Sequence, residues 1–466
     1  MPQVNNGTGA PRSRIVVASM IGTTIEFYDF YIYATAAVSV FPLLFFPKSD
    51  TGAALLASMA TFGVAFVARP VGSVFFGHFG DRIGRKATLV GSLLTMGVAT
   101  FLIGLLPPFV RIGLLAPVIL TLLRFCQGLG LGGEWSGAAL LVTETAEEGK
   151  RAWAAMWPQL GAPFGFILAN GFFLILTVLF NYNSAEAQLQ GEFLGWGWRI
   201  PFLVSLLMVA VGLYVRLKLD ETPVFARAVA RGEKLKMPLA QVFRHNPKEL
   251  LLGTFIMLAT YGLFYLMTTW ILSYAIGRTE LGFLGIGYRN FLVLQLVAVL
   301  LFAGMIPVAG RLADRFGRRS VLLVVTAGII LFGLTFNLFL NPRVMGTGEH
   351  ANAWLMLLFL SIGMTLMGLT FGPMSAILPE LFPTNVRYTG SGIAYNVSSI
   401  LGAALTPFAA VWLVRHHGVG AVGLYLSGLS VLTFIALWVS KETRHTSLDT
   451  PDDEESATAG IEFTSP

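Results

Sequence analysis

The chain is poor in cysteine and in charge. Its 466 residues include one cysteine, Cys126, which excludes an intrachain disulfide, and only 12% of them are charged. Soluble proteins carry about 25% charged residues, whereas this chain is 55% hydrophobic and has a mean hydropathy of +0.72. So long and apolar a chain cannot bury its hydrophobic side chains in one water-facing globule, and we therefore expect it to lie in lipid.

The sequence also lacks the motifs of common cofactor sites. It contains no G-x-x-x-x-G-K-[ST] loop to bind ATP, and neither a nucleophile–base set nor a cluster of metal ligands appears. Gly128, Gly130 and Gly133 fit G-x-G-x-x-G, but no strand precedes them and the flanks are apolar, so close helix packing explains them better. We therefore expect no cofactor, no metal and no enzymatic activity.

Twelve apolar segments are long enough to cross a membrane as helices. A bilayer core of about 30 Å needs roughly 20 apolar residues in a helix. The segments cover approximately residues 15–41, 52–76, 87–107, 114–143, 153–180, 199–218, 249–276, 288–309, 320–340, 352–378, 389–414 and 419–440. The polar residues 1–14 have no apolar core of a cleavable leader, so the first segment is expected to act as the insertion signal. The predicted fold class is an all-α polytopic membrane protein.

The distribution of basic residues predicts the orientation. With the N-terminus inside the cell, the inner segments hold 22 of the 31 Lys and Arg residues and the outer segments hold seven. Cytoplasmic loops of membrane proteins carry such an excess. Both termini are therefore predicted to be cytoplasmic, in a plasma membrane (the inner membrane of a bacterium). The same excess accounts for the net charge of +6, so we expect no nucleic-acid partner.

The two halves of the chain repeat. The ten residues from Gly77, GHFGDRIGRK, match GRLADRFGRR from Gly310 at five positions, with an offset of 233 residues. The pairs Glu144–Arg151 and Glu380–Arg387 also share one spacing. A duplicated six-helix unit predicts two pseudo-symmetric bundles with a site at their interface near the midplane. The predicted organisation is a tail (1–14), a first bundle (15–218), a central cytoplasmic loop (219–248), a second bundle (249–440) and a disordered cytoplasmic tail (441–466).

Ionisable residues inside the predicted spans are the first candidates for chemistry, because they are costly in lipid. Glu26 and Asp29 lie on one face of the first span, and Arg124 lies at a similar depth in the fourth. We expect Asp29 and Arg124 to face the central cavity within ion-pair reach and to couple a proton, or else to form a static interhelical pair. Glu134 has either a gating or an interfacial role, and Arg69 is interpreted as snorkelling toward the inner surface.

The second half has no charged residue deep in its spans, so its candidates for substrate contact are polar and aromatic. They are Tyr261, Tyr265, Gln295, Tyr395 and Asn396, together with Tyr28 of the first span. Aromatic residues in membrane spans also serve as packing or interface anchors, which is the alternative for each of them.

Four stretches give the sequence a family resemblance. They are the loop from Gly77 to Lys86, RFCQGLGLGGEW at 124–135, EFYDFY at 26–31 and PELFPTNVRYTG at 379–390. The chain resembles the major facilitator superfamily in the form of its metabolite:proton symporters, a branch that includes shikimate, α-ketoglutarate and proline/betaine permeases. The resemblance implies the major facilitator fold, alternating access, and a role of Arg124 and the neighbouring Gln127 in coupling.

The resemblance also implies a cytoplasmic gate that latches the two bundles together. Its candidate residues are Gly77, Asp81, Arg82, Gly84, Arg85, Glu144, Arg151, Asp314, Arg315, Arg318, Glu380 and Arg387. Asp81 is expected to meet the helix that starts near Thr389, because a helix N-terminus favours an anion.

The function predicted from these observations is proton-coupled uptake of a small carboxylate-bearing or zwitterionic metabolite by a monomer. The expected partners are an organic acid, amino acid or betaine-like substrate, protons and the lipid bilayer. Residues 158–165, PQLGAPFG, loosely fit an antiporter motif and leave a proton antiporter or exporter as the alternative. A membrane receptor or a membrane-embedded enzyme is a more distant one.

Overall fold

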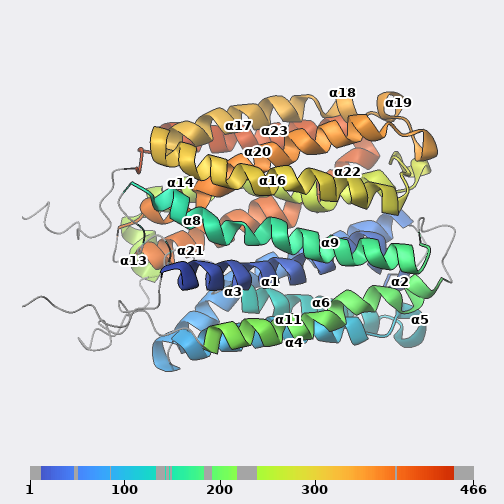
Figure 1. Cartoon of the computed structure of the whole chain (residues 1–466), viewed down its shortest axis with the longest axis horizontal. Helices are drawn as coiled ribbons and strands as arrows, with labels where there is room; N and C mark the ends of the chain where they lie inside the picture. Colours follow the sequence, from blue (N-terminus) through green and yellow to red (C-terminus); the bar gives the residue numbers. More distant parts are fainter. Residues whose placement is uncertain are drawn as a thin grey trace, which may run out of the picture.

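The computed structural model describes residues 12–46, 51–83, 85–132, 142, 146, 149–182, 191–217, 239–383 and 386–444. Within these ranges the regular structure is entirely helical. The long helices run side by side along one axis, and the start of α1 and the end of α23 lie at the same end of the bundle (Figure 1). We call this the inner end and the opposite one the outer end.

The first half contributes six membrane-spanning units. They are α1 (Arg12–Ser39), α3 (Thr51–Ile83), α4 (Arg85–Leu105), α6 (Leu115–Leu131), α8 (Arg151–Gln159) with α9 (Gly161–Leu179), and α11 (Ile200–Leu217). Short helices at the connections are α2 (Phe41–Leu44), α5 (Phe109–Ile112), α10 (Glu192–Gly195) and the 3₁₀ turn η1 (Gly197–Arg199).

The second half contributes six more. They are α14 (Pro247–Tyr265) continued by η2 (Leu266–Trp270) and α15 (Ile271–Ile276), α16 (Tyr288–Phe316), α17 (Arg318–Leu334) with α18 (Phe336–Leu340), α20 (Ala353–Glu380), α21 (Arg387–Ser398) continued by η5 (Ser399–Ala404) and α22 (Leu405–His417), and α23 (Val419–Val439). The shorter pieces are α13 (Leu239–His245), η3 (Thr279–Leu281), α19 (Pro342–Met345) and η4 (Gly348–His350).

Each of the twelve predicted segments falls on one of these helical units. Among the described residues, eight helices are long and apolar enough to cross a membrane, and two shorter apolar ones cover 90–105 and 115–131. The other two units are α1, which carries Glu26 and Asp29, and α17, which begins with two arginines. The predicted fold class is confirmed.

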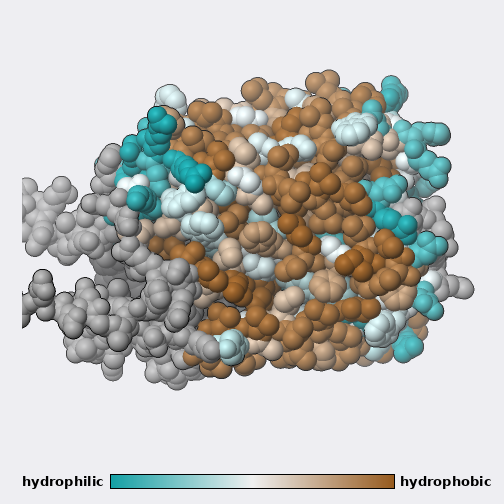
Figure 2. Space-filling view, viewed as in Figure 1, coloured by the Kyte–Doolittle hydropathy of each residue, from teal (hydrophilic) through white to brown (hydrophobic). Residues whose placement is uncertain are grey.

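The surface is apolar where a membrane would surround it. Large hydrophobic side chains such as Val324, Leu331 and Leu424 are 75%, 64% and 63% exposed. Figure 2 shows apolar residues over the middle of the visible face and hydrophilic residues gathered toward its ends. Such a belt is stable only when lipid covers it, as the composition predicts.

Glycines allow helices of the first half to touch backbone to backbone. A Cβ atom on Gly128 of α6 would lie 2.2 Å from the carbonyl oxygen of Ala65 in α3. One on Gly132 would lie 2.0 Å from the carbonyl oxygen of Arg69. The glycine pattern therefore serves close helix packing, as predicted, rather than nucleotide binding.

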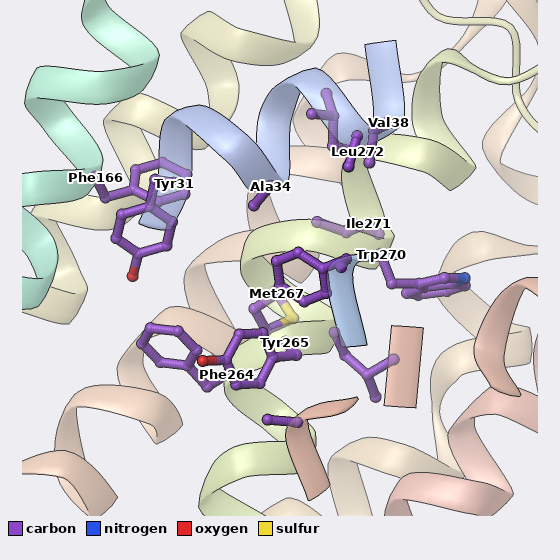
Figure 3. Close-up of a cluster of buried hydrophobic side chains, with 14 of the residues drawn as sticks. Tyr31, Ala34, Val38, Phe166, Phe264, Tyr265, Met267, Trp270, Ile271 and Leu272 are labelled. Carbon is purple, nitrogen blue, oxygen red and sulfur yellow. The ribbon is translucent and has the colours of Figure 1, made fainter. Parts of the chain in front are cut away.

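The two halves meet along a long interface. The helix α16 packs on α8 and α9, α20 packs on α8, and η5 packs on α3. In Figure 3, Tyr31 of α1 lies beside Phe166 of α9, and Phe264 and Tyr265 at the end of α14 lie nearby. Two turns at this interface, η2 and η5, are π-helical. This form is rare in proteins overall, but it occurs often at functional sites.

The predicted disordered tail begins too early. The carboxylate of Glu442 accepts hydrogen bonds from the backbone N–H groups of Arg318, at 2.8 Å, and Arg319, at 3.1 Å. The hydroxyl of Thr443 donates to Glu380 at 2.7 Å. The prediction is therefore wrong for these residues, because an acidic side chain after α23 caps the N-terminus of α17. Residues 445–466 lie outside the described ranges.

Candidate functional site

A small central cavity lies between the two halves, with room of about 20 Å³ in this conformation. Residues from α1, α3, α6, α8, α14, α20 and α21 line it, so both halves contribute to its walls. This is the location at which the internal repeat predicts a site. Pockets that hold small molecules typically have volumes of about 300–1,000 Å³, so the cavity is nearly closed in this conformation and must widen to admit a metabolite.

Aromatic rings form most of the cavity wall. Phe264 and Phe371 stack with ring centroids 5.3 Å apart, and Phe27 lies 6.0 Å from Phe264. The rings of Tyr261 and Tyr395 are 5.5 Å apart. Because these side chains come from α1, α14, α20 and α21, a relative movement of the two halves would change the shape of the cavity.

Arg69 is a cavity residue. Its side chain lines the cavity, is 6% exposed, and holds its guanidinium 4.7 Å from the ring centroid of Phe66. The interpretation as a snorkelling residue is wrong. Its guanidinium is buried against an aromatic ring at the cavity and does not extend to the inner surface. The Nε atom of Arg69 has no hydrogen-bond partner.

Glu26 is the second charged residue of the cavity. It lines the same wall as Arg69 and interacts with it electrostatically. The other described lining residues are uncharged, among them Gln159, Thr260 and Tyr265. The cavity therefore presents one carboxylate and one guanidinium on a largely aromatic surface.

Arg124 is buried behind the cavity wall. It is 0% exposed and lies among three rings, 4.0 Å from the centroid of Tyr33, 5.0 Å from that of Phe62 and 5.2 Å from that of Phe30. Its Nη1 donates to Oε1 of Gln127 at 3.0 Å, while Nε and Nη2 have no partner. It is not a lining residue. The expectation that Arg124 faces the cavity is wrong for this conformation.

The rings that hold Arg124 also separate it from Arg69. Phe62 and Phe66 have centroids 5.5 Å apart, and Tyr265 lies 5.8 Å and 5.2 Å from them. Arg69 sits against Phe66 on one side of this cluster, and Arg124 sits against Phe62. Phe30, which contacts Arg124, and Tyr265 also line the cavity, so these rings form the wall between Arg124 and the cavity.

Asp29 is linked to Arg124 through two neutral side chains. Ser205 donates to Oδ1 of Asp29 at 2.6 Å, and Thr100 donates to Oδ2 at 3.2 Å. Gln127 donates to the oxygen of Thr100 at 2.7 Å and accepts from Arg124. The expected direct ion pair is wrong, because the carboxylate of Asp29, which is 1% exposed, turns toward α4 and α11 rather than α6.

The remaining substrate candidates separate into two groups. Tyr261, Tyr265 and Tyr395 line the cavity. The other three are engaged elsewhere: Tyr28 donates to the carbonyl of Pro201, Gln295 to the carbonyls of Met267 and Thr268, and Asn396 to Ser73. Glu134 lies outside the described residues.

A carboxylate on a helix N-terminus joins the two halves at the inner end. Asp314, near the end of α16, accepts hydrogen bonds from the backbone N–H groups of Ala152, at 3.0 Å, and Trp153, at 2.9 Å, in the first turn of α8. The positive end of the helix dipole strengthens this contact. We call it the inner latch. It is the repeat-related counterpart of the contact predicted for Asp81.

A buried ion network supports the inner latch. Arg318 lies 3.2 Å from Asp314 and 3.3 Å from Glu380. Arg387 begins α21 and donates to the carbonyl of Phe382, and the carbonyl of Arg315 accepts from Arg444. Arg151 begins α8 and is 8% exposed.

The other gate candidates belong to the predicted inner ends of the first half. The side chains of Gly77, Asp81, Arg82, Gly84, Arg85 and Glu144 lie outside the described residues.

The outer end has a latch that the sequence interpretation missed. Arg289, at the start of α16, donates to the carbonyl of Thr177 at 3.1 Å and to Oδ1 of Asn181 at 3.4 Å, at the C-terminus of α9. Its neighbour Tyr288 donates to Ser39 of α1 at 3.4 Å. We call these contacts the outer latch. Arg289 is one of the seven basic residues assigned to the outer segments, and its position at the start of an apolar span was the available signal.

The chain is similar to known membrane transporters over most of its length. The profile of the Major Facilitator Superfamily matches residues 20–403. The inner membrane metabolite transport protein YhjE of Escherichia coli (strain K12) is 54% identical over 437 residues, which cover 94% of this chain and 96% of that protein.

The chain belongs to the Major Facilitator Superfamily.

Two further relatives have named substrates. A glycine betaine/proline/ectoine/pipecolic acid transporter, OusA of Dickeya dadantii (strain 3937), is 33% identical over 93% of this chain and 84% of its own length. The shikimate transporter of Escherichia coli (strain K12) is 33% identical over 92% of this chain and 95% of its own. The predicted family is confirmed, and the chain is a membrane transporter of metabolites rather than an enzyme.

The fold agrees with a solved transporter structure. The proton:xylose symporter XylE bound to 6-bromo-6-deoxy-D-glucose superposes with a TM-score of 0.69 at 15% sequence identity, over 94% of this chain and 97% of that one. At this identity the likeness concerns the fold alone.

Proposed function

We propose that this transporter carries a small carboxylate-bearing or zwitterionic metabolite into the cell together with a proton. The observation that carries the proposal is the buried chain Asp29–Thr100–Gln127–Arg124, which ends in a guanidinium with two unpaired nitrogen atoms beside the cavity. The shikimate transporter and the glycine betaine/proline/ectoine/pipecolic acid transporter are named for compounds that carry a carboxylate.

Asp29 is the proposed proton carrier. A charged carboxylate at 1% exposure is costly, and two hydroxyl donors compensate part of that cost. Proton binding removes the negative charge, so Ser205 and Thr100 lose an ionic acceptor and Arg124 loses the anion to which Gln127 connects it. The positive charge of Arg124 is then no longer compensated, and it favours an anion in the adjacent cavity.

The two latches provide the proposed alternating access. In both latches, α16 contacts the continuous unit α8–α9. Asp314 contacts the first turn of α8, and Arg289 contacts the last turn of α9. These residues are 25 positions apart in one helix, about 38 Å. Rocking of α16 against this unit breaks one latch while it keeps the other. We propose that the inner end, and with it both termini, faces the cytoplasm.

The membrane potential supplies part of the energy in this scheme. Each net charge that moves across 100 mV contributes about 2.3 kcal/mol, and a proton moving with a zwitterion carries one such charge.

The exporter alternative depended on residues 158–165, and packing accounts for the two glycines among them. A Cβ atom on Gly161 would lie 2.7 Å from the Cβ of Thr23, and one on Gly165 would lie 2.7 Å from the Cβ of Phe27. Both glycines therefore allow α9 to approach α1 closely.

Uptake by proteoliposomes tests the proposal. A substrate is first chosen as the compound that raises the melting temperature of the purified protein most, because a ligand of the folded state stabilises it. We expect concentrative uptake only with an imposed pH gradient or membrane potential, and collapse with a protonophore. Asp29→Asn should abolish concentrative uptake and keep counterflow exchange. Accumulation that resists a protonophore and follows a sodium gradient would contradict proton coupling.

A further inference from the structure

The cavity contains one positive and one negative side chain. Arg69 of α3 and Glu26 of α1 both line it, and the other lining residues in the described part of the chain are uncharged. The two charges interact electrostatically. A ligand that contacts both side chains meets one positive and one negative group, so a ligand with the complementary pair of charges is favoured.

Arg69 presents a site for an anion. Its side chain is 6% exposed, its guanidinium is held 4.7 Å from the centroid of the Phe66 ring, and its Nε has no hydrogen-bond partner. A buried donor without a partner is costly, and a planar guanidinium fork matches a carboxylate better than any single point charge does. The oxygen of Thr260, which is 2% exposed, also lacks a partner and belongs to the same wall.

Glu26 and three tyrosines provide a site for the cationic group of a ligand. Tyr261, Tyr265 and Tyr395 line the cavity with Glu26, and the Tyr261 and Tyr265 rings stack 6.3 Å apart. Aromatic faces attract organic cations, and quaternary ammonium groups in particular bind to such surfaces. A carboxylate beside them adds a direct counter-charge.

We infer that the cavity selects a zwitterion, whose carboxylate binds Arg69 and whose cationic nitrogen lies between Glu26 and the tyrosine rings. The inference deepens the proposed function, because it assigns the substrate class and two specificity residues to the same cavity. A dicarboxylate brings its second anion toward Glu26. A simple monocarboxylate leaves Glu26 without a counter-charge from the ligand.

The test uses compounds that differ in one charge at nearly constant shape. Glycine betaine is compared with 3,3-dimethylbutyrate, its isostere without the positive charge, and with choline, which lacks the carboxylate. L-proline is compared in the same way with cyclopentanecarboxylate and L-prolinamide. Binding to the purified full chain is measured by thermal shift and by calorimetry.

We expect at least one zwitterion to bind, and each of its two truncated analogues to bind about 10- to 100-fold more weakly, the effect of one charge-assisted contact. Glu26→Gln should reduce the preference for the zwitterion over the uncharged-nitrogen isostere by at least tenfold. Arg69→Lys should weaken binding of both compounds that carry a carboxylate and leave the ratio between them unchanged.

A matched control separates specificity from folding. Tyr28→Phe alters the same helix as Glu26, but its hydroxyl contacts Pro201 outside the cavity, so the ratios should stay at the wild-type value. The melting temperature without ligand reports whether each variant is folded.

Failure of both zwitterions to bind, or binding of an isostere as tight as that of its zwitterion, would overturn the inference. An unchanged zwitterion preference in Glu26→Gln would do the same. A zwitterion that binds with the expected ratios but enters proteoliposomes without a proton would instead refute the proposed function and leave this assignment intact.

Discussion

Replacing Asp314 by Asn should open the inner end of the transporter more often. The carboxylate accepts hydrogen bonds from the N–H groups of Ala152 and Trp153 with separate oxygens. An amide keeps one acceptor, turns an N–H donor toward the second N–H group, and loses the favourable charge at the helix N-terminus. The ion pair with Arg318 lies within the second half, so its loss should affect both conformations similarly.

The expected shift follows from these two contacts. Asp314 is only 12% exposed, so solvent screens the interaction weakly. Loss of one such capping bond costs about 1–2 kcal/mol, which corresponds to a factor of about 5–30 in an equilibrium constant. The population that is open at the inner end should rise by that factor.

Cysteine labelling measures this population. Cys126 is the chain's one cysteine, so Cys126→Ala provides a background without thiols. Ala376→Cys then places a probe in the buried inner cluster of Ala152, Ala155, Ala313 and Ala376. We expect N-ethylmaleimide to label this probe about 5–30 times faster in Asp314→Asn than in the parent.

The outer latch supplies a control of opposite sign. Arg289→Gln weakens the contacts with Thr177 and Asn181, which should favour opening at the outer end. Labelling at position 376 should therefore slow by about 2- to 10-fold, as expected for one ordinary hydrogen bond. An unchanged rate in Asp314→Asn, or a faster rate in Arg289→Gln, would refute the latch mechanism.

Three further substitutions test other parts of the structure. Arg124→Lys should reduce uptake by at least tenfold while substrate binding in the cavity persists, because an ammonium cannot keep both the Gln127 contact and the fit among the three rings. Uptake and calorimetry on one preparation compare transport with binding. Normal uptake would argue against coupling through Arg124. Gly132→Ala should lower the melting temperature, since its Cβ would lie 2.0 Å from the Arg69 carbonyl oxygen, whereas Gly171→Ala, with nothing within 4 Å, should not. Glu442→Gln should cost about 1 kcal/mol of stability by weakening the cap of α17, and an unchanged melting temperature would show that this cap contributes little.

The spans and the repeat could be predicted because each follows from a long pattern. An apolar run of about 20 residues has one stable solution in lipid, and a motif repeated at an offset of 233 residues identifies the two halves. The counterpart of the predicted Asp81 contact is present at Asp314, on the first turn of α8. Asp81 itself lies outside the described side chains, and its contact stays a prediction.

The partners of the buried charges could not be predicted from depth alone. Asp29 and Arg124 are both buried, as expected, but depth along an axis does not fix the direction in which a side chain points around it. Asp29 turns toward Ser205 and Thr100, and the ring of Tyr33, one turn further along α1, occupies the position beside Arg124. Arg69 was misinterpreted for the same reason, because its depth in the second span did not show that its side chain lines the cavity.

The most direct test of the central claim is a measurement of proton movement itself. Proteoliposomes in a weakly buffered medium receive the substrate chosen by thermal shift, with potassium and valinomycin to prevent a build-up of charge, and a pH electrode follows the medium. Proton symport predicts alkalinisation of the medium that starts with substrate addition, is absent in Asp29→Asn, and disappears with a protonophore. Substrate uptake by the wild-type protein at constant external pH, or equal alkalinisation by Asp29→Asn, would contradict it.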